Sequence, residues 1–309
     1  MPVPAHAASQ TRAPRRSPFP ASLGVAGATL AVSFSAIFIR LAGSDAATIV
    51  WLRMSLAVLL LAPFAARDVR LRRAPRERRD LGLVAAGAVF LAGHFLFWTA
   101  SLAYTSVAAS VLLVSLHPLV VAPLGRRLLG ERPGAATYAG MGLAVAGTLI
   151  TCAGDLRVDA RALTGDLLAI AGGLCLAGYL LIGRNLRSSL GAAGYSAAVY
   201  AGVAAAAAAV AAAGGTAHLP SLRVAALCLA LAAVCTVAGH TVLNWALRHV
   251  RAVTVSLAFL GEPPLAALLA LAILGAVPPV TTVAGGVLIL AGLALALRDP
   301  PALPAPLVS

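Results

Sequence analysis

The chain has 309 residues, of which 61% are hydrophobic and only 11% are charged, and its formal net charge is +13. Soluble domains carry about a quarter charged residues, so this composition excludes an ordinary soluble protein and favours a membrane protein. All 23 basic residues are arginines, and they gather in short loops between apolar runs. That placement is typical of a topology signal and argues against a nucleic-acid-binding protein.

The two ends of the chain differ from the rest. Residues 1–20 are rich in proline, alanine and arginine and predict a disordered cytoplasmic tail, and residues 299–309 predict a second cytoplasmic tail. No cleavable signal peptide is evident, because the apolar run that begins at residue 21 is too long for one.

The apolar runs between the tails predict ten membrane-spanning helices, because one span needs about 20 apolar residues. The predicted helices cover 22–41, 46–65, 81–103, 106–125, 134–152, 164–183, 192–213, 222–246, 252–274 and 279–297. Many of their residues are alanine or glycine, which suits helices that pack closely in a membrane.

The chain contains an internal repeat. LLGERPGAATYAG at 128–140 returns as ILGAVPPVTTVAG at 273–285, which is 145 positions later and without charges. The repeat divides the chain into a first half, 21–153, and a second half, 160–298, with five predicted helices each. Because five is odd, the second half enters the membrane upside down. The predicted fold is therefore an all-α integral membrane protein whose ten transmembrane helices form two inverted five-helix repeats.

The arginines predict the orientation of this fold. With the N-terminus in the cytoplasm, 18 arginines fall on the inside and 4 on the outside, as the positive-inside rule requires. The basic loop 67–80 then marks orientation and touches anionic lipid, and we expect no nucleic-acid partner. The prediction is a multi-pass protein of the inner (plasma) membrane with both termini cytoplasmic.

Two polar residues stand beside prolines at matching positions of the repeat. Glu262 lies in the ninth predicted helix before Pro263 and Pro264, and His117 lies 145 positions earlier, before Pro118. A carboxylate inside a membrane is costly and marks a functional site by default, and interrupted helices are where transporters bind substrates and ions. We expect Glu262 and His117 to line a central cavity; the alternative is a pair that only locks two kinked helices together.

Five further residues are candidates for the same cavity. Arg53, in the second helix, either extends toward the membrane surface or pairs with a substrate carboxylate. His94 and Trp98 share one helical face of the third helix. His240 and Asn244 occupy the matching region of the eighth helix. Such a polar and aromatic lining would suit an amphipathic metabolite.

The four cysteines, Cys152, Cys175, Cys228 and Cys235, all lie in apolar segments and lack the spacing of a metal site. They are expected to be packing residues. We expect no cofactor and no bound metal.

Three segments carry a resemblance to a known family. They are LRMSLAVLLLAP (52–63), the stretch 100–150 that contains LLGERPG, and the stretch 245–295 that contains GEPPLAALLALAILG. With its five-helix halves, the chain resembles the EamA family of the drug/metabolite transporter superfamily. The resemblance implies a secondary transporter of amino acids or related small metabolites, usually outward. The chain departs from the family pattern at Ala276, where the counterpart of Glu131 is missing.

The leading hypothesis is thus a secondary transporter that works by alternating access around a site at the membrane midplane. An exporter of lipophilic cations is the alternative within transport. An intramembrane enzyme would need paired catalytic groups, and a channel would need a filter or rings of like charge; the sequence contains neither. The expected partners are a small-molecule substrate, membrane lipid and a proton as candidate coupling ion, and a homodimer stays open.

Overall fold

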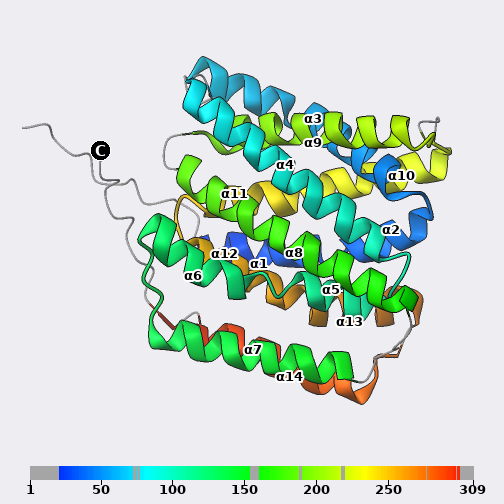
Figure 1. Cartoon of the computed structure of the whole chain (residues 1–309), viewed down its shortest axis with the longest axis vertical. Helices are drawn as coiled ribbons and strands as arrows, with labels where there is room; N and C mark the ends of the chain where they lie inside the picture. The colour runs from blue at the N-terminus through cyan, green and yellow to red at the C-terminus, as the bar shows by residue number, and fades with distance from the viewer. Residues whose placement is uncertain are drawn as a thin grey trace, which may run out of the picture.

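The computed structural model describes residues 21–71, 75, 77–153, 160–187, 190–216, 220–275, 277–296 and 298–299. Every regular element in these residues is a helix (Figure 1). Residues 1–20 and 300–309, which hold nearly all of the predicted tails, lie outside the described residues, as do part of the basic loop and Ala276.

The first half contains five spans, two of which are interrupted. The elements are α1 (Ala21–Val32) and α2 (Ser35–Ala42), α3 (Ala46–Arg70), α4 (Arg78–Ser101), α5 (Val107–Val114) and α6 (Pro118–Leu129), and α7 (Ala135–Ala153). The first span breaks between α1 and α2, and the fourth breaks between α5 and α6.

The second half also contains five spans. Its elements are α8 (Ala160–Leu186), α9 (Ala192–Ala213), α10 (Leu222–Ala230) with the π-helix η1 (Leu231–Thr241) and α11 (Val242–Ala246), α12 (Ala252–Ala258) with the 3-10 helix η2 (Phe259–Gly261) and α13 (Glu262–Leu274), and α14 (Val280–Ala296). The eighth span is continuous but contains the π-helix, and the ninth changes from α-helix to 3-10 helix before Glu262.

The ten predicted spans are all helical, with some differences in length. Eight are long and apolar enough to cross a membrane, and α7 and α14 are shorter apolar helices. The second helix extends to Arg70 rather than residue 65, because the arginines near its end are compatible with helix. The sequence prediction missed the break at Ser33 and Phe34, which carries neither proline nor glycine.

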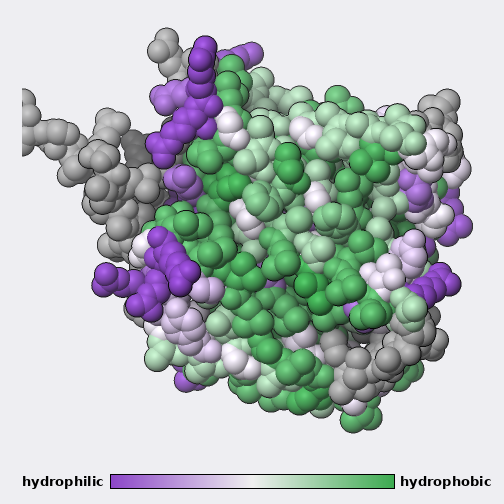
Figure 2. Space-filling view, viewed as in Figure 1, coloured by the Kyte–Doolittle hydropathy of each residue, from purple (hydrophilic) through white to green (hydrophobic). Residues whose placement is uncertain are grey.

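The surface has the pattern of a membrane protein. Large apolar side chains are exposed in mid-helix, such as Leu59 at 68% and Val89 at 72%. Figure 2 shows hydrophobic residues over the middle of one face and hydrophilic residues gathered at its two ends. Lipid tails would cover the middle region.

The contacts between helices of different halves stay the same when the two halves are exchanged. The second spans of the halves, α3 and α9, pack together, and so do the fifth spans, α7 and α14. The contact of α4 with α8 is matched by that of η1 with α1, and the contact of α4 with α9 by that of η1 with α3. Each pairing thus has its counterpart, which is the signature of a pseudo-two-fold axis.

Glycines show that the halves are inverted. The backbone at Gly140 in α7 meets Gly292 in α14, and that at Gly147 meets Gly285. As residue numbers rise in α7 they fall in the partner, so α7 and α14 run antiparallel. Equivalent helices that run in opposite directions confirm the inverted repeat.

Carboxylates form hydrogen bonds at the ends of two helix pairs, α3 with α9 and α7 with α14. Asp45 accepts a hydrogen bond from the Thr48 amide (2.9 Å) at the start of α3 and another from the Thr216 hydroxyl after α9 (3.2 Å). Asp299, beyond α14, accepts one from the Thr137 amide at the start of α7 (2.9 Å). These contacts join first-half residues to second-half residues at both ends of the bundle.

The described chain ends lie at the same end of the bundle. Ser22 and Asp299 line one pocket together with Thr137 and Arg251. We call this end the tail face, and the opposite end, which contains Asp45, Thr105 and Thr216, the far face. In Figure 1 the tail face is on the left, where the C label lies.

Candidate functional site

A small cavity lies inside the bundle where the interrupted helices meet. The centre of a water-sized sphere can occupy about 10 Å³ inside it, so the cavity holds about one water molecule. It is lined by Val32, Ser35, His94, Trp98, Val114, Ser115, His117, Leu176, His240, Phe259 and Glu262. Five of the seven predicted site residues are therefore brought together in this central cavity.

The lining follows the pseudo-two-fold axis. Four pairs of lining residues are 144 to 146 positions apart and come from equivalent spans: Val32 with Leu176, His94 with His240, Val114 with Phe259, and His117 with Glu262. The cavity thus lies on the axis that relates the halves, so a relative movement of the halves would change its shape.

Hydrogen bonds to helix carbonyls hold two of the histidines. The Nδ1 atom of His117 lies 3.0 Å from the carbonyl oxygen of Val114, and that of His94 lies 3.0 Å from the carbonyl oxygen of Gly172. Because a carbonyl can only accept, Nδ1 must donate in both rings. In a neutral imidazole, Nε2 is then left as an acceptor.

Several polar atoms at the cavity have no hydrogen-bond partner within the described residues. They are the Nε2 of His117, the indole Nε1 of Trp98 and the hydroxyl of Ser35. Glu262 is only 5% exposed and takes no part in an ion pair in the described chain. Since buried polar groups are nearly always satisfied, this set of donors and acceptors predicts a polar ligand or water.

Aromatic rings enclose these polar groups. Phe259 contacts the rings of His117 (5.4 Å between centroids) and His240 (5.7 Å), and Trp98 stacks on His94 (6.0 Å). The cavity therefore combines a carboxylate, ring nitrogens and π faces, a set that suits a small amphipathic molecule.

Arg53 lies next to the cavity but does not line it. It is 1% exposed, its Nε donates to the hydroxyl of Thr236 (2.7 Å), and its guanidinium lies 4.4 Å from the ring centroid of Phe95. Phe95 in turn packs against His240, 5.1 Å away. Arg53 thus neither extends to the membrane surface nor reaches the lining of this cavity, and its pairing with a substrate carboxylate stays a prediction.

Asn244 also lies outside the lining. Its side-chain oxygen accepts from the hydroxyl of Tyr179 (2.8 Å), and its amide nitrogen donates to the hydroxyl of Ser196 (2.9 Å). Tyr179 stacks on Tyr195 at 6.4 Å. These partners occupy Asn244 in a cluster among α8, α9 and α11.

Six lining residues were not predicted from the sequence: Val32, Ser35, Val114, Ser115, Leu176 and Phe259. Ser35 and Ser115 lie at helix breaks, and Phe259 begins the 3-10 turn before Glu262. Of these, Phe259 and Val114 had a signal, because Pro263 and Pro118 remove the amides that would serve their carbonyls. The π-helix that contains His240 had no sequence signal, although π-helical segments are frequent at functional sites.

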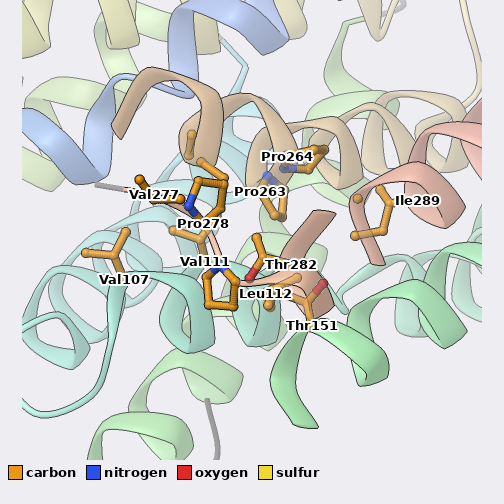
Figure 3. A pocket seen from close by; sticks show the side chains of 14 residues that line it. Val107, Val111, Leu112, Thr151, Pro263, Pro264, Val277, Pro278, Thr282 and Ile289 are labelled. Carbon is orange, nitrogen blue, oxygen red and sulfur yellow. The ribbon is translucent and has the colours of Figure 1, made fainter. Parts of the chain in front are cut away.

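A second, larger pocket lies on the far-face side of Pro263 and Pro264 (Figure 3). Its free volume is about 190 Å³, and its lining, from α5, α13 and α14 among others, is almost wholly apolar. In Figure 3 the hydroxyls of Thr151 and Thr282 are the polar side-chain atoms near it. This pocket lacks the groups that would recognise a polar molecule.

The described residues contain no group of three or more His, Cys, Asp or Glu with the geometry to hold a metal ion.

Comparisons with known proteins give a family and a fold. The model of the EamA-like transporter family matches residues 20–153 and 163–298. A solved structure described as "Crystal structure of protein" is similar with a TM-score of 0.75 and 21% sequence identity, covering 91% of this chain and 99% of that chain. At this identity the likeness shows the fold alone. No curated protein matches the chain.

Proposed function

This chain belongs to the EamA-like transporter family, and on that premise we propose that it exports amino acids or related small metabolites by alternating access around the central cavity. The two halves, 21–153 and 160–298, are the moving bodies. The convergence of Glu262, His117, His94, His240 and Trp98 on one cavity carries the proposal. The family is one of transporters, so the intramembrane-enzyme alternative is withdrawn.

The chemistry of the cavity supports an amino acid or a similar compound. Glu262 and the Nε2 of His117 can accept hydrogen bonds from an ammonium group. The indole of Trp98 and the hydroxyl of Ser35 can donate to a carboxylate. A lipophilic cation would use the carboxylate and the aromatic faces but would leave these two donors unpaired, which disfavours the alternative of a multidrug exporter.

The size of the cavity supports a closed conformation. Room for about one water molecule is too small for an amino acid, so the halves must separate before a substrate can enter. Glu262 is also the natural carrier for a coupling proton, because a buried carboxylate can exchange a proton for a cationic substrate group.

The arginine distribution supports an orientation with the tail face in the cytoplasm of a cell with an inner membrane. Arg126, Arg127, Arg184 and Arg248 all lie toward that face. We therefore assign the cytoplasmic side to the tail face and the outer side to the far face.

A transport assay tests the proposal. Metabolites that are less toxic to cells when the protein is present would identify substrates, and reconstituted vesicles would then measure radiolabelled flux and counterflow. Glu262→Gln should lower transport about tenfold or more, the scale of a lost charged hydrogen bond. Glu77→Gln is the matched control, since Glu77 is exposed and makes no side-chain cap bond. Full transport with unchanged pH dependence in Glu262→Gln would refute the site.

A further inference from the structure

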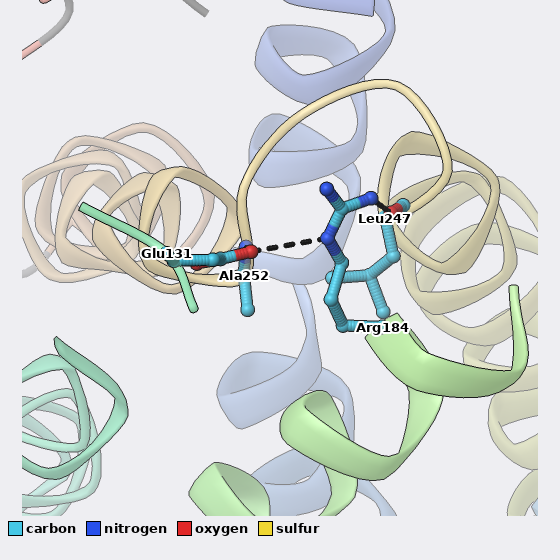
Figure 4. A network of polar contacts seen from close by, with 4 residues as sticks. All are labelled: Glu131, Arg184, Leu247 and Ala252. Atoms are coloured by element: carbon cyan, nitrogen blue, oxygen red, sulfur yellow. Dashed lines mark hydrogen bonds and ion pairs between the residues drawn. The ribbon is translucent and has the colours of Figure 1, made fainter. Parts of the chain in front are cut away.

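A buried ion pair joins the two halves at the tail face (Figure 4). Glu131, in the turn between α6 and α7, accepts a hydrogen bond from the Nε of Arg184 at the end of α8 (3.0 Å). The same carboxylate oxygen accepts the backbone amide of Ala252 at the start of α12 (2.9 Å). Arg184 also donates to the carbonyl of Leu247. One first-half carboxylate therefore contacts two second-half spans, α8 and α12, and its partner Arg184 also bonds the loop between α11 and α12.

Burial makes the loss of one partner of this pair more costly than it would be in an ordinary surface ion pair. The side chains of Arg184 and Glu131 are only 12% and 7% exposed. Surface pairs contribute little because water and salt screen them, whereas removing one partner of a buried pair leaves an uncompensated charge. The pair joins oppositely charged side chains, one from each half of the chain.

The pair is connected to the central cavity through α12. This helix begins at Ala252, whose amide Glu131 accepts, and it leads through η2 directly to Glu262. Nearly all of α12 is buried. A short packed helix transmits a shift at one end to the other, so the position of Ala252 affects that of Glu262.

The far face closes differently. There Arg223 donates to the carbonyl of Leu41 (3.0 Å) in an exposed position, and Asp45 accepts a hydrogen bond from the hydroxyl of Thr216 (3.2 Å). In the sequence, Ala276 stands 145 positions after Glu131, so the repeat has no carboxylate at the matching position. The two ends of the bundle are thus held by contacts of unequal strength.

We propose that Glu131 and Arg184 are positioning residues of the transport cycle, which keep the tail face closed and hold α12, and which must separate before the central cavity opens to that face. The proposal rests on the alternating access proposed above. Opening at the tail face requires the halves to part there, and the Glu131–Arg184 pair is a buried ion pair that crosses between them.

A cysteine-labelling experiment tests this inference without a substrate. Ser256 in α12 is fully buried, its hydroxyl has no partner in the described chain, and cysteine is nearly its size. In a background lacking the four native cysteines, Ser256→Cys reports opening by its reaction with a membrane-impermeant maleimide. Inside-out vesicles present the tail face. Glu131→Gln and Arg184→Gln should each raise the labelling rate about tenfold, since losing the pair shifts the closed–open equilibrium.

Controls separate opening from general loosening. Arg223→Gln removes an arginine contact between the halves at the far face and should leave labelling from the tail face unchanged. The double variant Glu131→Gln/Arg184→Gln should label no faster than either single variant, because both remove one interaction. Arg184→Lys keeps the charge but cannot reproduce the two donated bonds, and it provides a milder test if a Gln variant fails to fold.

Three outcomes would overturn the inference: an unchanged labelling rate in both Gln variants, an equal rise in Arg223→Gln, or an equal rise in vesicles of the opposite orientation. Because no substrate is used, the result is independent of Glu262→Gln transport. The two experiments therefore distinguish a refuted binding site at Glu262 from a refuted role of the Glu131–Arg184 pair.

Discussion

His117 uses its two ring nitrogens for two different purposes. Its Nδ1 donates to the carbonyl of Val114, which the break before α6 leaves without a helical partner, and its Nε2 is buried at the cavity without a partner in the described residues. Asparagine places its amide nitrogen near the position of Nδ1, and glutamine places its amide near that of Nε2. The two substitutions therefore separate the structural role from the binding role.

We expect His117→Asn to keep the fold and to weaken substrate binding. Loss of a hydrogen bond to a charged substrate group corresponds to about 1.5–3 kcal/mol, or roughly tenfold or more in apparent affinity. His117→Gln should retain transport but melt at a lower temperature, because Val114 loses its donor. Transport kinetics and thermal unfolding of both variants make the comparison; the reverse ranking would contradict a binding role for Nε2.

Individual site residues were predictable only where a proline in the sequence marks a break in the helix. Glu262 and His117 could be found because each precedes a proline at equivalent points of the repeat. Ser35 could not, since the break before α2 contains neither proline nor glycine. Arg53 lies beside the cavity, yet the packing of Phe95 keeps its guanidinium out of the lining. Such a detail depends on side-chain direction, which spacing along a helix does not determine.

At the scale of the helices, Asp299 joins the end of the second half to the start of α7. Hydrogen bonds from the hydroxyl and the amide of Thr137 hold the pKa of Asp299 below its usual range. A lowered pKa means that the ionised form stabilises the fold. This stabilisation is complete above the ordinary aspartate value of about 3.9 and is lost as the pH falls through the lower folded value.

Asp299→Asn should therefore lower the melting temperature at pH 7 by about 2–4 °C, the scale of a lost helix cap. The difference from the wild type should begin to shrink as the pH falls below about 4, where the carboxyl of the unfolded chain takes up a proton, and should vanish below the lower pKa of the folded state. Thermal unfolding in detergent across this pH range measures both effects. Thr137→Val combined with Asp299→Asn should be no worse than either alone, and a difference that grows in acid would contradict the cap.

The seam between α7 and α14 depends on glycines at matching positions. A methyl group added at Gly140 would collide with the backbone at Gly292 and Ala296, whereas one added at Gly142 in the same helix meets nothing within 4 Å. Gly140→Ala should push the helices apart and cost about 1–3 kcal/mol. Gly142→Ala is the matched control and should be neutral or stabilising, because alanine is the better helix former. Equal thermal stability of the two variants would contradict the close contact.

At the scale of the whole molecule, the sequence predicted the architecture better than it predicted the individual site residues. Apolar run lengths set the number of spans, and the phrase shared by 128–140 and 273–285 showed the repeat. Both features follow from the membrane, which requires long apolar helices with internally bonded backbones. The central cavity was less predictable, because it depends on where three helices change course, and only two of those changes are marked by proline.

The orientation of the whole molecule is the last expectation to test. The arginine bias predicts that the tail face, and with it both termini, lies in the cytoplasm. A fluorescent protein fused after residue 309 should therefore fluoresce, and alkaline phosphatase fused after Asp45 or Thr216, at the far face, should be active because that enzyme folds only outside the cytoplasm. Inserting phosphatase in the basic loop 67–80 is the matched control and should be inactive. Phosphatase that is inactive at both far-face sites and active in the basic loop would reverse the orientation, exchange the inner and outer sides of the Glu131–Arg184 pair, and turn the proposed cytoplasmic closure into an external one.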